Sequence, residues 1–104
     1  MAGGRLTPEQ RWFEEHSTGA PEPLRERAAH YLARRAEPEL AERLAGAAND
    51  ALGAVLSHPG DRSVALDLLA ADALITLALK ARALADPADL ARFAASLSVP
   101  QSPP

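Results

Sequence analysis

Hydrophobic residues between positions 64 and 84 repeat on two opposite sides of a helix. The segment reads VALDLLAADALITLALKARAL, and at about 100° per residue its apolar positions fall into two faces. The first face holds Val64, Leu68, Ala71, Ile75 and Leu79, and the second holds Leu66, Ala70, Ala73, Leu77 and Leu84. Such a helix has to be covered on two sides, by helices of the same chain or of a second chain. We therefore expect a central, two-sided apolar helix at about 62–84.

Charged residues interrupt this segment too often for a membrane span. A transmembrane helix needs about 20 consecutive apolar residues. Asp67 and Asp72 lie inside the segment, and Arg62 and Lys80 limit it on both sides. We therefore expect the helix to be buried in protein, without membrane contact.

The N-terminal part of the chain carries clear signals for helix starts and ends. Thr7, Pro8 and Gln10 have the spacing of a capping box with proline at the first helical position. Gly19 and Pro21 end this short first helix, and a second helix is predicted over residues 21–36.

A third, amphipathic helix is predicted after Pro38, with its apolar stripe running from Leu40 to Val55. Gly46 and Gly53 each weaken such a helix by about 1 kcal/mol relative to alanine. We expect these glycines to allow close approach of the central helix. A turn at residues 57–60 follows, and Asp61 is the expected cap of the central helix.

A fifth helix is predicted after the Asp86-Pro87 signal. Its apolar stripe has the i, i+3, i+4, i+7 spacing of one helix face and comprises Leu90, Phe93, Ala94 and Leu97. Residues 98–104 read as a disordered, proline-rich tail and residues 1–6 as a flexible start. Residues 7–97 are then a single helical domain.

The composition supports an all-α fold, a compact bundle of four to five helices. The chain has 104 residues, among them 24 alanines and 16 leucines, and alanine is the best helix former. Alanines let helices approach closely, but each buries little apolar area. Self-association would bury further apolar area and so stabilise a core in which each side chain contributes little.

Charge and residue content narrow the function classes. A formal net charge of -3 argues against general binding of nucleic acid or of anionic membranes. The absence of cysteine excludes disulfides, thiolate nucleophiles and cysteine-bound metals. No apolar targeting segment opens the chain, so a cytoplasmic location is the default expectation.

Few residues are arranged for chemistry. His16, His30 and His58 have no spacing typical of a metal site, and no serine lies in a nucleophile motif. We therefore expect no cofactor, no metal and no catalytic machinery. The chain's one local basic cluster is Arg27, His30 and Arg34, which could bind an anion or simply form a solvated face.

Asp72 is the candidate residue for ligand binding, because it lies midway along the most apolar helix. A buried carboxylate without a partner costs several kcal/mol or takes up a proton. It could anchor a ligand or act as an acid or base in a pocket shared with Thr76 and Tyr31. Alternatively it belongs to a solvent-facing seam with Thr76 and Lys80, or pairs with an arginine.

The functional prediction is a small protein-interaction or scaffolding module that associates as a homodimer or binds another protein. The expected interface is one face of the central helix, formed by Leu66, Ala70, Ala73 and Leu77. The competing hypothesis is a small-molecule-binding protein or enzyme with a pocket between helices around Asp72.

Overall fold

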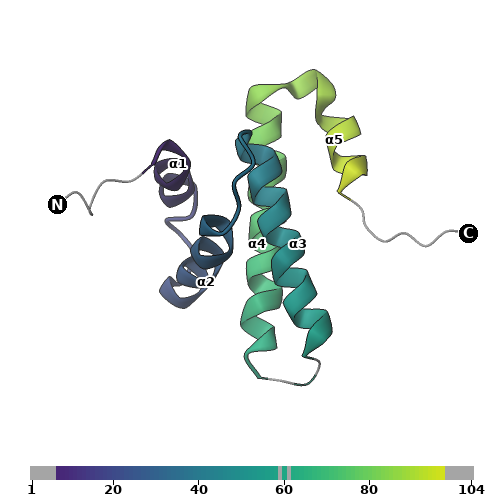
Figure 1. The fold of residues 1–104 in the computed structure, drawn as a ribbon. Helices are drawn as coiled ribbons and strands as arrows, with labels where there is room; N and C mark the ends of the chain where they lie inside the picture. Colours follow the sequence, from purple (N-terminus) through teal and green to yellow (C-terminus); the bar gives the residue numbers. More distant parts are fainter. Residues whose placement is uncertain (1–6, 59, 61, 98–104) are drawn as a thin grey trace, which may run out of the picture.

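Two long antiparallel helices form the centre of the fold (Figure 1). They are α3, Leu40–Ser57, and α4, Val64–Ala85. The computed structural model describes residues 7–58, 60 and 62–97. In these residues all regular secondary structure is helical, which confirms the predicted all-α bundle. None of the helices in the described ranges is long and apolar enough to cross a bilayer.

Three shorter helices flank this hairpin, two on one side and one on the other. α1, Pro8–His16, and α2, Glu22–Ala33, lie on one side, whereas α5, Leu90–Ser96, lies on the other (Figure 1). A 3-10 turn at Pro87–Asp89 connects α4 to α5. The hairpin is therefore covered by two helices on one side and by a single short helix on the other.

The local start and stop signals place the helices well. At the start of α1 the Gln10 amide donates to Thr7 Oγ1 at 3.1 Å, and the Thr7 amide donates to Gln10 Oε1 at 2.9 Å, which is the predicted capping box. α2 ends at Ala33, earlier than predicted. A helix could not continue through Glu37 in any case, because Pro38 disfavours helical backbone angles at the residue before it. The predictions for residues 1–6, Asp61 and residues 98–104 lie outside the described residues.

The core forms where α3 and α4 face each other. Leu44 and Leu74 are fully buried, and alanines such as Ala47 and Ala78 lie between the two helices without solvent exposure. Small side chains let the helix axes approach closely, so the two leucines fill the space that remains. The hairpin is therefore held by few large side chains, as the composition indicated.

The two glycines of α3 do not serve the contact with α4 that the sequence suggested. A Cβ on Gly46 would lie 2.6 Å from the Arg35 Nε, so this glycine makes room for an arginine side chain. Arg35 in turn pairs with Glu37 and Asp50, at 2.5 and 3.3 Å. A Cβ on Gly53 would meet nothing within 4 Å. The expectation of close helix approach at these positions was wrong.

Candidate functional site

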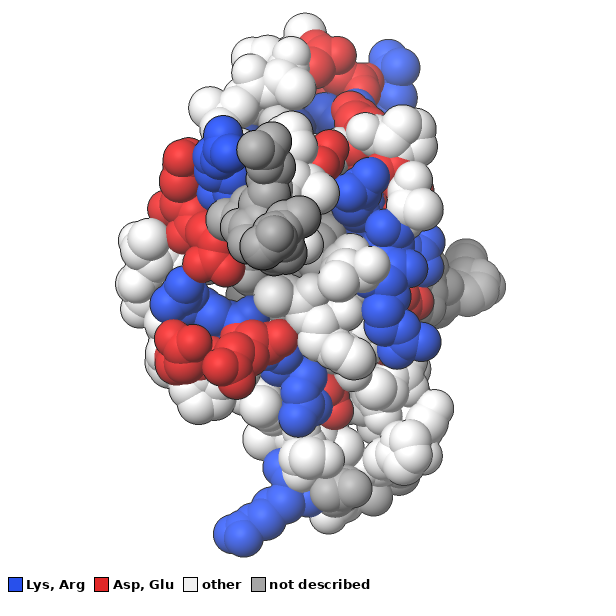
Figure 2. Space-filling view, turned by 60° about the vertical axis from the view of Figure 1, so that its left-hand side comes forward, with Lys and Arg blue, Asp and Glu red and all other residues white. Residues whose placement is uncertain are grey.

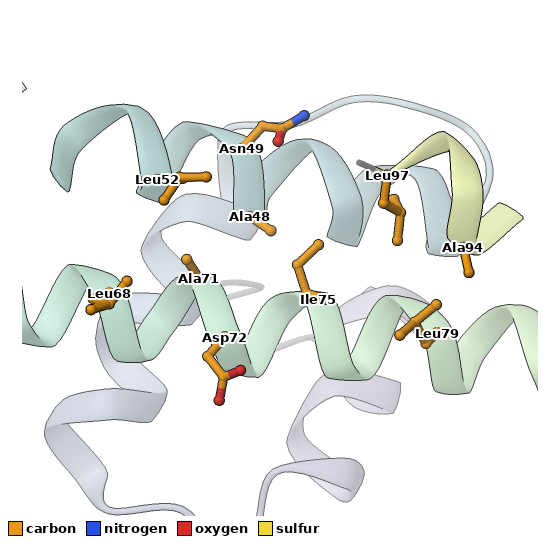
Figure 3. A pocket seen from close by; sticks show the side chains of 10 residues that line it. All are labelled: Ala48, Asn49, Leu52, Leu68, Ala71, Asp72, Ile75, Leu79, Ala94 and Leu97. Atoms are coloured by element: carbon orange, nitrogen blue, oxygen red, sulfur yellow. The ribbon is translucent and has the colours of Figure 1, made fainter. Parts of the chain in front are cut away.

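An apolar groove of about 470 Å³ lies between α3, α4 and α5 (Figure 3). Its wall on α4 is formed by Leu68, Ala71, Asp72, Ile75 and Leu79. Ala48, Asn49 and Leu52 of α3 form the opposite wall, and Ala94 of α5 and Leu97, which follows α5, close one end. Nearly all of the lining is therefore hydrophobic.

The spacing of the groove residues on α4 is that of a helix-packing seam. Leu68, Asp72, Ile75 and Leu79 follow one another at i, i+4, i+7 and i+11. This alternation of four and three residues is how one helix presents a stripe to another helix. Leu68 nevertheless remains 51% exposed. The stripe thus lacks a packing partner at its Leu68 end, whereas α5 covers the other end.

Polar groups lie at the two edges of the groove. Asn49 is exposed on the α3 edge and Asp72 on the α4 edge, and the Asp72 carboxylate points away from α3 (Figure 3). No ion pair to this carboxylate occurs within the part of the chain that the structure describes. Thr76 Oγ1 donates to the Asp72 backbone carbonyl at 2.9 Å, and Lys80 is exposed as well. Asp72 therefore sits at the solvent-facing seam with Thr76 and Lys80.

The residues expected at a dimer interface are placed mostly inside one chain. Ala70 is fully buried and Leu77 is 8% exposed, whereas Leu66 and Ala73 are partly buried. Leu66 lines a hollow together with residues of α2. Most of this face of α4 is thus covered by its own chain, although Leu84 at its end is 65% exposed. On the opposite face Leu68 is 51% exposed, and it is the exposed leucine that lines the groove.

The structure brings Tyr31 to Asp67, away from Asp72. The Tyr31 hydroxyl donates to Asp67 Oδ1 at 2.9 Å, and Arg27 Nη1 donates to the same oxygen at 2.5 Å. Asp67 is only 6% exposed. One buried carboxylate on α4 therefore holds two side chains of α2. The i, i+4 spacing of Arg27 and Tyr31 on α2 was the available sequence signal for this cluster.

The basic residues proposed for anion binding are only partly brought together. Arg27 and His30 line one hollow of about 500 Å³ with Glu26 and Asp67, and Arg34 is not among its lining residues. Arg27 is already paired with Asp67. Acidic and basic side chains are interspersed over the face shown in Figure 2. The positive charge of Arg27 is therefore neutralised by Asp67 and is not free to bind an anion.

Burial of the ring raises the pKa of Tyr31 above its ordinary value of 10.0, and the hydrogen bond to Asp67 raises it further. Because the folded state favours the protonated phenol, this contribution to stability is complete below pH 10.0 and is lost as the pH rises through the folded-state pKa. We expect the free energy of unfolding to fall at alkaline pH. Tyr31→Phe should reduce that fall relative to the wild type in urea titrations, and equal alkaline slopes would contradict the contact.

α5 is attached to the hairpin through Arg82. The Arg82 guanidinium lies 4.2 Å from the centre of the Phe93 ring and pairs with Asp89 at 3.0 Å and Glu39 at 2.6 Å. Cation–π and ion-pair contacts of a largely buried arginine are directional, so they fix α5 at one end of the groove. The hydrophobic stripe of α5 was predicted from the sequence, whereas this arginine was not.

No metal site is formed by the described residues, in which no group of three or more histidine or acidic side chains is placed to hold an ion. Comparison of the chain with protein-family models, curated proteins and solved structures gives no match. The function is therefore inferred from the groove and from the polar cluster of Arg27, Tyr31 and Asp67.

Proposed function

We propose that this protein is a self-associating helical interaction module and that the groove between α3, α4 and α5 is its contact surface. The observation that carries the proposal is the apolar lining of the groove together with the half-exposed Leu68. An exposed apolar surface of this kind is typical of a protein contact site. The alanine-rich core adds a reason, because association buries further apolar area.

A second copy is the partner that fits the groove best. The partly covered stripe on α4 has the spacing of a seam between helices, and every copy of the chain supplies such a stripe. In a two-fold dimer the same surface occurs on both partners, so one unpaired apolar face is sufficient. Leu52 and Ile75, both partly buried in the single chain, would be covered further.

A small apolar ligand is the second candidate occupant. The groove volume of about 470 Å³ lies in the range of ligand pockets, and Asp72 would suit a cationic group at its edge. This alternative predicts that an apolar amine binds a monomer at the groove and that Asp72→Asn weakens its binding. Tyr31 takes no part in it, because its hydroxyl is bonded to Asp67.

Adjacent leucines on α4 provide a matched pair for testing self-association. Leu68 and Leu69 are 51% and 53% exposed, but only Leu68 lines the groove. Leu68→Asp should weaken dimerisation about 30-fold, because two copies of the leucine lose apolar contact and two carboxylates are placed in the interface. Leu69→Asp should leave the dimerisation constant near that of the wild type. Sedimentation equilibrium measures both constants.

Comparison of Leu68→Asp with Leu69→Asp distinguishes a specific contact at the groove from a general loss of surface hydrophobicity. Circular dichroism should show that both variants stay folded, because both side chains are about half exposed. Equal weakening by the two substitutions would place the contact outside the groove. No weakening by Leu68→Asp would remove the proposal.

A further inference from the structure

We infer that α5 of a second copy docks in the open end of the groove, so that each copy covers the surface that the other leaves exposed. This arrangement rests on the proposed self-association and specifies which element of the partner makes the contact. It is reciprocal, as a two-fold interface requires.

The groove has room for a second helix because α5 is much shorter than the hairpin. α5 has 7 residues, about 10 Å at the usual helical rise, whereas the groove wall on α4 runs from Leu68 to Leu79, about 17 Å. Ala94 and Leu97 border the groove at the α5 end, and Leu52 and Leu68 line it beyond α5 (Figure 3). One α5 therefore fills only part of the length, and a second α5 can lie beside the remainder.

The outer surface of α5 suits this position. Phe93 is buried toward the hairpin, with its ring against Arg82 of α4, so the opposite side of the helix carries the exposed Ala91 and Ala95. Small side chains allow a helix to approach apolar side chains closely. Arg92 flanks these alanines, and its side chain is 87% exposed.

Charge complementarity identifies a specific pair across the contact. Asp72 is the one charged residue among those that line the groove, and no cation pairs with it in the described ranges. Within the part of the chain that the structure describes, Arg92 forms a single ion pair, with Asp89 of its own chain at 3.4 Å. An arginine on the docking helix and a carboxylate at the groove edge attract each other, and symmetry makes the contact twice.

The C-terminal segment of the same chain is a poorer occupant. Residues 98–104 read SVPQSPP, in which Val99 is the only large apolar side chain besides the prolines. The segment has no charged side chain for Asp72. A second α5 offers both the small apolar surface and the cation.

Single charge reversals and their mixture test the inference. Asp72→Arg should weaken the homodimer about tenfold because Arg92 of the partner then faces a cation, and Arg92→Glu should weaken its homodimer similarly. When the two variants are mixed, one of the two symmetric contacts regains its native Asp72–Arg92 pair. The other contact joins the two substituted positions, which carry opposite charges in reversed order. The mixture should therefore form heterodimers with a dissociation constant within about threefold of the wild type.

Sedimentation equilibrium of the two variants, alone and mixed, distinguishes the outcomes. Rescue on mixing supports the inference, because a contact within one chain cannot be restored by a second chain. A wild-type dimer whose variants show no rescue overturns the docking of α5 but leaves the self-association intact. A monomeric wild type overturns both, and truncation after Leu97 that abolishes the dimer would assign the groove to the tail.

Lys80→Glu is the matched control for Arg92→Glu. Lys80 is also an exposed cation, but it does not line the groove. The control changes the net charge by the same amount and should leave the dimer within about threefold of the wild type. Equal weakening by both substitutions would mean that net charge, and not the Asp72–Arg92 pair, controls association.

Discussion

Leu74→Ala is expected to lower the free energy of unfolding by about 3 kcal/mol, because it leaves a cavity in a core with few large side chains. Leu74 is 0% exposed, and most of the buried side chains of α3 and α4 are alanines. Helices that approach closely through alanine cannot easily move inward to fill the space. Urea denaturation at a fixed protein concentration measures the effect.

The control for this prediction is Leu69→Ala on the same helix. Leu69 is 53% exposed, so its truncation should change the free energy of unfolding by about 0.5 kcal/mol or less. A loss below about 1 kcal/mol for Leu74→Ala would show that the hairpin core is loosely packed. In that case the close α3–α4 contact would not be the main source of stability.

Asp67→Ala is the second large effect, with an expected loss of about 2.5 kcal/mol. The substitution removes the acceptor for the buried Tyr31 hydroxyl and leaves Arg27 without its ion pair. Arg27 is 32% exposed, so water replaces part of its lost interaction and the loss is smaller than for a fully buried pair. Thermal or urea unfolding followed by circular dichroism measures it.

A double-mutant cycle shows whether the cluster acts as a unit. Tyr31→Phe should cost less in the Asp67→Ala background than in the wild type, because the hydroxyl has already lost its acceptor. Additive losses would contradict a direct hydrogen bond between Tyr31 and Asp67. Asp72→Ala is the matched control, because Asp72 is an exposed aspartate on the same helix, and it should have little effect on stability.

Local signals in the sequence were sufficient for the helices. The capping box at Thr7 placed α1, and the apolar segment at about 62–84 coincides with α4 to within two residues at each end. Capping and helix propensity depend on residues a few positions apart, which a single sequence displays. Gly46 shows the limit, since its neighbour Arg35 approaches from outside the helix.

Which face of α4 is covered within the chain could not be predicted from the hydrophobic periodicity. Leu66 and Leu68 belong to equally apolar faces in the sequence, and only the position of α2 decides which one is covered within the chain. The same holds for the two aspartates. Asp67 is buried beside α2 and Asp72 is exposed at the groove, because helix packing and not local composition sets their surroundings.

The central claim is that a second copy covers the groove. The most direct test is the molar mass of the wild-type chain as a function of concentration. Light scattering after size-exclusion chromatography should show the mass rising from 11.0 kDa toward twice that value as the concentration increases through the micromolar range. A mass that stays at 11.0 kDa at every concentration would contradict it.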